Sequence, residues 1–349
     1  MNILSPVDSA KEAELLIKAG ATELFCGYIP KSWSEKYQVI EGEHVQSKKK
    51  AELLSVSLNK RNNIEGNITD CDELVNILKI ANENNVKVYI TLNAFYYTEH
   101  EYDYIKNYIQ ELLDLGVYGF IVTDVALISF IHEYFPQAVI VLSCCNQVAN
   151  SACAKFFGDL GVKRITFPRH VTLDEILNIA SNVPELEYEC FVLDSRCVYD
   201  DGNCRAMHNF GHFCMEQWDL EYFDCTGKKD ISYQEIEDIR QNEIDFTKWS
   251  KPYLSLNARN HGWYAISCCA CAIPYLLKQG NLKSLKIAGR GLDTTSKIMM
   301  VRAVTKMLSI ANNSENPVKD EKDYICKLVG VPELCENQTR CLFASKHYQ

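Results

Sequence analysis

Short apolar runs alternate with amphipathic segments along most of the chain, and this alternation constrains the fold more than any other feature. Runs of this kind are typical of parallel strands buried on both faces, whereas the amphipathic segments match helices. Eight strands are predicted, at 2–5, 23–27, 87–92, 119–123, 138–143, 164–168, 187–192 and 284–287. Helices are predicted at 11–19, 72–84, 101–115, 127–135, 151–160 and 173–182.

Alternating strand–helix units predict a parallel sheet with right-handed crossovers. Eight units favour closure into an α/β, TIM-like (βα)8 barrel, in which the chemistry lies at the carboxyl ends of the strands. An open, doubly wound sheet is the alternative fold. No Gly-x-Gly-x-x-Gly follows the first predicted strand, and this weakens a dinucleotide-binding interpretation.

Three stretches interrupt the strand–helix rhythm. The stretch 29–70 is polar and too long for an ordinary loop. The second stretch, about 198–266, contains cysteines, histidines, aromatic residues and an acidic helical stretch around 234–241. A polar break at 312–317 precedes a tail with three more cysteines. We therefore predict a barrel over 1–311, with a long cysteine-containing insertion after its seventh strand, and a small C-terminal extension over 312–349.

Sixteen of the 349 residues are cysteines, which raises the question of compartment. The chain shows no uncharged apolar run long enough for a membrane helix and no signal-peptide pattern at its start, so we expect a cytoplasmic protein without membrane insertion. Disulfides are uncommon in the cytosol, and the cysteines therefore indicate metal ligation, redox chemistry or simple burial. A net charge of −10 disfavours nucleic acid as a partner, without excluding a local basic patch.

The most informative cysteines follow the predicted seventh strand. Cys197 comes directly after it, Cys204 lies seven positions later, and Cys214 follows after nine intervening residues. These spacings are too wide for a structural zinc knuckle, whereas an iron–sulfur cluster tolerates them. Burial as small hydrophobes is the competing explanation for any free cysteine. We favour burial for Cys71, Cys153 and Cys190, and ligation for Cys197 and Cys204.

The segment around these cysteines matches a family signature. Glu189, Phe191, Ser195, Cys197, Gly202 and Cys204 fit a Glu-x-Phe-x-x-Gly-Ser/Ala-aliphatic-Cys pattern that continues, after four residues, into Gly-x-Cys. The chain thereby resembles the family catalogued as peptidase U32. Further matching segments lie at 91–93, 142–150, 163–169 and 284–290, and Asp124 matches as well, so the resemblance covers roughly residues 1–310.

The resemblance implies a 4Fe–4S cluster held by four cysteines. Cys197 and Cys204 align with the first two ligands, Cys214 is the candidate for the third, and Cys268 is the candidate for the fourth because it lies six residues before Pro274. Cys225 is the substitute for the third ligand, and Cys269 and Cys271 are alternates for the fourth. Cys326, Cys335 and Cys341 of the tail receive no role from the resemblance.

The resemblance also implies an activity. Better-understood relatives are oxygen-independent hydroxylases that modify a ubiquinone precursor or RNA bases, and some of them take the oxygen atom from prephenate. We therefore expect a hydroxylase or related oxidoreductase that acts on a small-molecule or peptide substrate. The alternatives are a peptidase, and a non-catalytic redox or scaffold subunit with a protein partner. No His-Glu-x-x-His pair or Gly-x-Ser-x-Gly elbow supports proteolysis.

Five residues are candidates for binding the substrate. Arg169 and Arg290 follow the predicted sixth and eighth strands, where a guanidinium fork suits a carboxylate. A structural ion pair with Asp124 is the competing role. Asn93 and Asn150 are candidates for orienting substrate, although asparagine at a strand end also caps helices. The chain departs from the family pattern at 193–194, Cys145 and Ala288, and this predicts a different substrate or reaction if those positions handle substrate.

Overall fold

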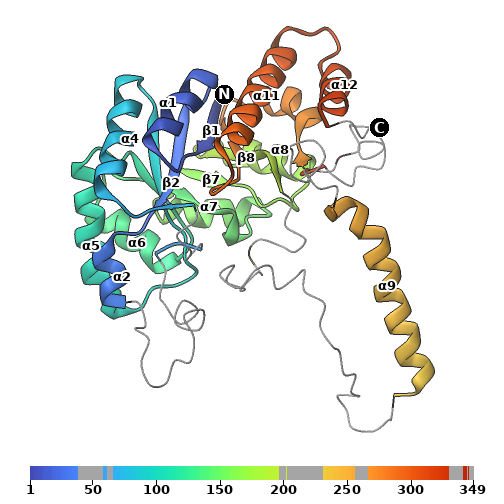
Figure 1. Ribbon diagram of the computed structural model, residues 1–349, viewed down its shortest axis with the longest axis horizontal. Coiled ribbons are helices and arrows are strands. Elements are labelled where there is room, and N and C mark those ends of the chain that lie inside the picture. The colour runs from blue at the N-terminus through green and yellow to red at the C-terminus, as the bar shows by residue number, and fades with distance from the viewer. Residues whose placement is uncertain are drawn as a thin grey trace.

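The computed structural model describes residues 1–37, 58–60, 66–195, 202, 231–255, 266–329, 341–343 and 345. Eight parallel strands form a closed barrel in it, because β1 pairs with β10 on one side and with β2 on the other (Figure 1). The predicted TIM-like fold is therefore confirmed. The barrel strands are β1 (Asn2–Pro6), β2 (Glu23–Tyr28), β4 (Lys87–Leu92), β5 (Gly119–Val122), β6 (Val139–Leu142), β7 (Arg164–Thr166), β8 (Glu187–Ser195) and β10 (Leu282–Ile287).

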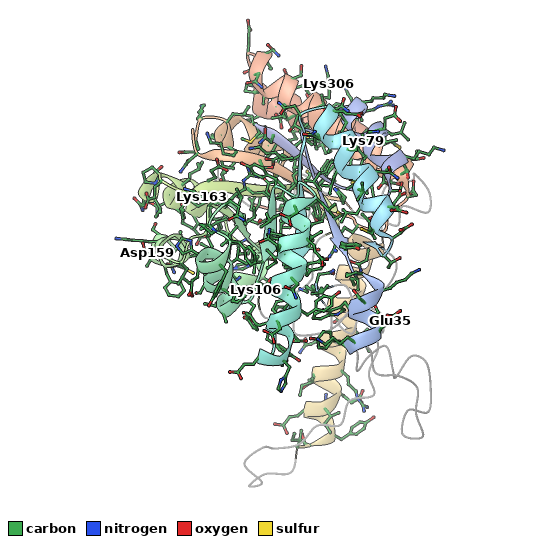
Figure 2. The ribbon with its side chains drawn as sticks, turned by 90° about the vertical axis from the view of Figure 1, so that its left-hand side faces the viewer. Glu35, Lys79, Lys106, Asp159, Lys163 and Lys306 are labelled. Atoms are coloured by element: carbon green, nitrogen blue, oxygen red, sulfur yellow. The ribbon has the colours of Figure 1, made fainter. Side chains whose placement is uncertain are left out.

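Helices follow the strands and surround the barrel. Most of them begin at a short polar residue whose side chain accepts a backbone N–H of the first turn, as Ser9 does before α1 and Asp293 before α11. Lys79, Lys106 and Asp159 lie exposed on this helical layer (Figure 2). These helices are α1 (Ala10–Ala19), α4 (Cys71–Glu83), α5 (Glu99–Asp114), α6 (Val125–Tyr134), α7 (Ser151–Asp159), α8 (Leu173–Asn182), α10 (Ile273–Leu276) and α11 (Thr294–Asn313).

The alternation of side chains along each strand separates two cores. One face of the strands packs against the helices in a large apolar cluster. The other face fills the barrel interior, where a small apolar cluster includes Phe25 and Tyr89. Buried charges complete that interior: Arg164 donates to both carboxylate oxygens of Glu23, at 2.8 and 3.1 Å, and Lys286 donates to Glu189 at 3.0 Å. The interior is therefore a packed layer that closes the barrel beneath its carboxyl end.

Several elements lie outside the eight repeats. The short strand β3 (Asn67–Ile68) pairs with β2, and β9 (Ile266–Cys268) runs antiparallel to β8. The other elements are α2 (Lys31–Tyr37), the 3-10 turns η1 (Cys144–Asn146) and η3 (Ala270–Ala272), α9 (Tyr233–Ser255) and α12 (Pro317–Val329). The acidic helical stretch predicted around 234–241 falls within α9. No helix of the described residues is long and apolar enough to cross a membrane.

Candidate functional site

Arg290 lies at the carboxyl end of the barrel, three residues after β10. Its side chain is buried, and its Nη1 donates to Thr91 Oγ1 at 3.0 Å, to Asn59 Oδ1 at 3.3 Å and to Asn67 Oδ1 at 3.4 Å. All three acceptors are neutral, so they position the guanidinium without cancelling its charge. A Cβ at position 27 would lie 2.3 Å from Nη1, and this close approach explains the glycine there.

Two residues of the family signature organise a second group of cations. The guanidinium of Arg169 lies 3.9 Å from the ring centroid of Phe191, and Lys286 Nζ lies 5.8 Å from the same centroid. Lys286 is anchored by its hydrogen bond to Glu189. A cation over an aromatic face is attracted to the ring quadrupole. Glu189 and Phe191 therefore have a structural reason to occur together: between them they hold two cations at this end of β8.

Lys60 contributes a further cation, which the sequence patterns did not single out. Its backbone N–H donates to Asn93 Oδ1 at 3.2 Å, and its Nζ donates to Cys145 Sγ at 3.6 Å. The same ammonium lies 5.1 Å from the ring centroid of Phe95. Because Lys60 lies in the irregular stretch 29–70, neither periodicity nor a motif marks it. Cys145 stands where the family pattern has glutamine, so this departure falls on a residue in direct contact with Lys60.

The remaining substrate candidates have local structural partners. Asp124 Oδ1 accepts the N–H of Leu127 at 2.7 Å and the hydroxyl of Tyr102 at 3.5 Å, and thereby caps α6. Asn150 caps α7 by accepting the N–H of Cys153 at 2.8 Å. Within the described ranges, no ion pair joins Asp124 to Arg169 or Arg290. The structure thus brings Arg169, Arg290 and Asn93 to the barrel mouth, and it uses Asp124 and Asn150 as helix caps.

Gly202 of the signature lies against the turn that follows β6. A Cβ at this position would stand 2.2 Å from Gln147 Cγ and 2.7 Å from the carbonyl oxygen of Cys145. This contact requires glycine, and it places one residue of the signature segment next to Cys145. Gly202 therefore lies near the turn that Lys60 contacts through Cys145.

Only some of the candidate cluster ligands lie among the described residues. Cys197, Cys204, Cys214 and Cys225 lie outside the described residues. Cys268 ends β9, where its Cα pairs with Leu193 of β8, and its side chain is partly exposed. Leu193 precedes Cys197 by four residues in the sequence. The described residues thus include Cys268 and its alternates Cys269 and Cys271, but not the other candidates.

Burial separates the other thiols of this region and of the helical layer. Cys269 is buried, its N–H donates to the carbonyl of Val192 at 3.0 Å, and burial raises its thiol pKa well above the usual value. Cys190 is fully buried and Cys153 is partly buried. Cys71 is exposed at the first turn of α4, so the interpretation as a packing residue is wrong for it. Cys71 is the first residue of α4, and its side chain faces solvent there.

The protein is therefore an α/β-barrel protein with a polar, cationic mouth. Its sequence signature leads from β8 of the barrel into a cysteine-rich insertion. The model of peptidase family U32 matches residues 8–336. The chain therefore belongs to peptidase family U32, and the resemblance drawn from the sequence is confirmed.

Curated relatives match parts of the chain. A tRNA hydroxylation protein P of Escherichia coli (strain K12) is 33% identical over 103 residues, which cover 29% of this chain and 23% of the relative. A tRNA hydroxylation protein P1 of Bacillus subtilis (strain 168) is 25% identical over 175 residues, covering 48% and 41%. An uncharacterised protease of Methanocaldococcus jannaschii is 31% identical over 191 residues, covering 47% and 45%. Each match spans less than half of the relative's own length.

Among solved structures, a U32 peptidase aligns with a TM-score of 0.40 and 15% sequence identity. The alignment covers 55% of this chain and 69% of that one. The barrel assignment rests on the strand pairing described above.

Proposed function

We propose that this protein is a U32 iron–sulfur enzyme that performs oxygen-independent hydroxylation, or a related redox modification, of a substrate bound in the barrel mouth. The observation that carries the proposal is the convergence of cations at one end of the barrel. Arg290, Arg169 and Lys60 come from three different segments, and they lie where the barrel fold places its chemistry. Relatives named for tRNA hydroxylation support a hydroxylation-related activity.

The chain's own side chains have separable tasks in this proposal. Arg290 binds an anionic group of the substrate, because its planar guanidinium lies at the mouth, where neutral side-chain oxygens position it. Asn93 fixes the backbone of Lys60, which presents an ammonium beside Cys145. The Glu189–Lys286 pair and Phe191 form the floor of the site, where they restrict motion and exclude water.

A 4Fe–4S cluster would be held by Cys197, Cys204, Cys214 and Cys268, with Cys225, Cys269 and Cys271 as alternates. When bound, such a cluster supplies electron transfer, and an iron without a cysteine ligand would additionally accept a ligand. The donor set is appropriate because thiolates are the usual ligands of these clusters. The described member of the set, Cys268, is partly exposed next to β8.

The relatives also bear on the substrate. The charge of −10 disfavours a nucleic-acid partner on average. Relatives named for tRNA weigh against that expectation, and the cations at the mouth form a local exception to the overall charge. A tRNA is therefore the first substrate to test, followed by small aromatic acids and peptides.

The proposal is tested by incubating the anaerobically purified protein with unmodified tRNA and an oxygen-atom donor, a carboxylic acid that is itself reduced by two electrons as the base is hydroxylated. We expect nucleosides that gain one oxygen atom, detected by mass spectrometry, and we expect the product to disappear in Cys197→Ala and Arg290→Ala. Lys79→Ala, an exposed change on α4, is the matched control and should retain activity. Cleavage of a peptide library by iron-free protein would instead identify a peptidase, and iron-containing protein without either activity would indicate a redox or scaffold subunit.

A further inference from the structure

The loop between β10 and α11, which carries Arg290, has an uncommon backbone. Gly289 and Gly291 flank the arginine, and both have positive φ angles, +121° and +78°. Side chains rarely tolerate this conformation, so the two glycines permit the turn in which Arg290 lies. Glycine is also the most flexible residue, and two glycines alone do not hold a turn in one conformation. The position of Arg290 therefore depends on contacts that fix this loop.

Asp8 supplies one such contact from the neighbouring strand. It lies two residues after β1, and β1 pairs with β10 in the barrel. Its Oδ2 accepts the backbone N–H of Gly291 at 2.7 Å. Hydrogen bonds to an ionised acceptor are stronger than bonds between neutral groups. Asp8 thus fastens the residue that follows Arg290 to the carboxyl end of β1.

Two buried side chains hold Asp8 in turn, where α1 packs beside α11 (Figure 1). Lys297 of α11 is fully buried, and its Nζ donates to Asp8 Oδ2 and, at 2.9 Å, to Glu12 Oε2. Glu12 Oε2 also accepts the N–H of Asp8 at 2.7 Å. A buried ammonium needs an anionic partner, and Glu12 already supplies one. Neutralising Lys297 therefore does not account for Asp8, whereas its bond to the Arg290 loop does.

A further contact reaches the same loop from the segment before β3. A Cβ at position 66 would lie 3.0 Å from the backbone N of Gly291 and 3.2 Å from Arg290 Cβ. The backbone of this segment therefore packs directly on the loop. Asp8 and the segment at Gly66 fix the main chain of the loop, whereas Thr91 and its neighbours fix the guanidinium.

We propose that Asp8, held by Lys297 and Glu12, is a positioning residue that sets Arg290 for binding an anionic group of the substrate. The inference rests on the proposed function for the role of Arg290, and it adds the residue that orders the loop. Asp8 acts through the loop backbone and makes no contact with the substrate. A loop that is ordered before binding costs less conformational entropy when the anion arrives. Loss of Asp8 should therefore weaken binding rather than slow the chemical step.

The first test measures how fast phenylglyoxal modifies Arg290 in the full-length protein, with each arginine followed separately by mass spectrometry. Asp8→Ala frees the loop and should speed the modification of Arg290 by about tenfold or more. Arg169 should react at its wild-type rate, which excludes general unfolding as the cause. Asp8→Asn keeps an oxygen that can accept the N–H of Gly291, and it should leave Arg290 nearly as protected as in the wild type.

Asp70→Asn, at the N-cap of α4, is the matched control and should not change the reactivity of Arg290. Equal modification rates of Arg290 in the wild type and in folded Asp8→Ala would overturn the inference.

Steady-state kinetics separate a positioning role from a structural one. Asp8→Ala should raise the KM for tRNA or for the carboxylic acid donor, whichever Arg290 binds, by about tenfold with little change in kcat. Asp8→Asn should restore most of the lost affinity. A lower kcat at unchanged KM values would overturn the inference. A protein without hydroxylation activity would contradict the proposed function alone, because the phenylglyoxal reaction still decides the role of Asp8.

Amide exchange in the wild type needs no substitution. The N–H of Gly291 should exchange about tenfold or more slowly than an unprotected amide, because it donates to the Asp8 carboxylate. Exchange at the unprotected rate would overturn the inference even if Asp8→Ala failed to fold.

Discussion

The barrel interior and helix α12 both bury charged side chains, but they differ in the partners that surround them. In the interior, Glu23 and Arg164 form a two-pronged pair, and Lys286 is bonded to Glu189. Glu189 Oε2 has no hydrogen bond, but it lies 3.6 Å from Arg164 Nη1. On α12, Glu321 is equally buried, yet neither of its carboxylate oxygens has a hydrogen-bond partner in the described residues. The interior therefore pairs its charges, whereas burial favours the neutral form of Glu321.

This difference shows how each region accommodates a buried charge. A network such as that of Arg164 pairs its charges and contributes rigidity. A buried carboxyl group without a partner avoids the cost of a buried charge by keeping its proton. The mouth differs from both regions, because three neutral oxygens position the Arg290 guanidinium.

The largest expected effect comes from breaking the interior network. Arg164→Met leaves Glu23 and Glu189 buried without their guanidinium, and should lower the free energy of unfolding by about 3–5 kcal/mol. Urea denaturation at pH 7 measures this loss. A loss below about 1 kcal/mol would mean that the interior network is dispensable.

Removing the orphaned carboxylate should have the opposite sign. Burial raises the pKa of Glu321 from 4.5 to about 9, so between these values the folded state holds a proton that the unfolded state has lost. Stability of the protein should therefore fall as pH rises from about 4.5 towards 9. Glu321→Gln removes this dependence, and at pH 7 it should stabilise the protein by on the order of 3 kcal/mol.

The pH profile distinguishes the cause of that gain. Wild type and Glu321→Gln should unfold alike near pH 4 and diverge above it. Parallel curves at all pH values would show that the variant acts through packing and that the carboxyl ionises normally.

The mouth should respond less than either buried region. Thr91→Val removes one acceptor of the Arg290 guanidinium and should destabilise the protein by about 1.5–3 kcal/mol, the usual worth of a hydrogen bond to a charged group. Thermal unfolding measures the loss. If stability were unchanged while substrate affinity fell, Thr91 would position Arg290 for binding only.

The smallest effect is expected on the surface. Lys18→Ala breaks an exposed pair with Glu14 on α1 and should leave the urea midpoint of unfolding unchanged. A large effect would show that exposed ion pairs contribute to the stability of this protein. The comparison between the buried regions would then not explain where its stability comes from.

Much of the fold is predictable because its signal is periodic. All eight predicted strands are present, with 87–92 matching β4 at both ends. The strand β9 was not predicted, since three residues that pair antiparallel with an extended β8 leave no periodic pattern. The last three residues of β8, 193–195, were missed for a similar reason: their strand character depends on pairing with β9.

The site is less predictable because its residues meet only in three dimensions. Arg169, Arg290 and Asn93 could be named because they follow strands in a barrel. Lys60 could not, since it comes from an irregular stretch and reaches the mouth through contacts with Asn93 and Cys145. The orphaned state of Glu321 has no sequence signal, because it depends on what packs around α12.

The iron and sulfide content of anaerobically purified protein tests the central claim most directly, when wild type is compared with Cys197→Ala and Cys271→Ser. The account predicts iron and acid-labile sulfide in equal amounts in the wild type, their loss in Cys197→Ala, and their retention in the control variant Cys153→Ser on α7; Cys271→Ser shows whether this alternate replaces Cys268 as the fourth ligand. An iron-free wild type, or iron that persists in Cys197→Ala, would contradict a cluster at the barrel mouth.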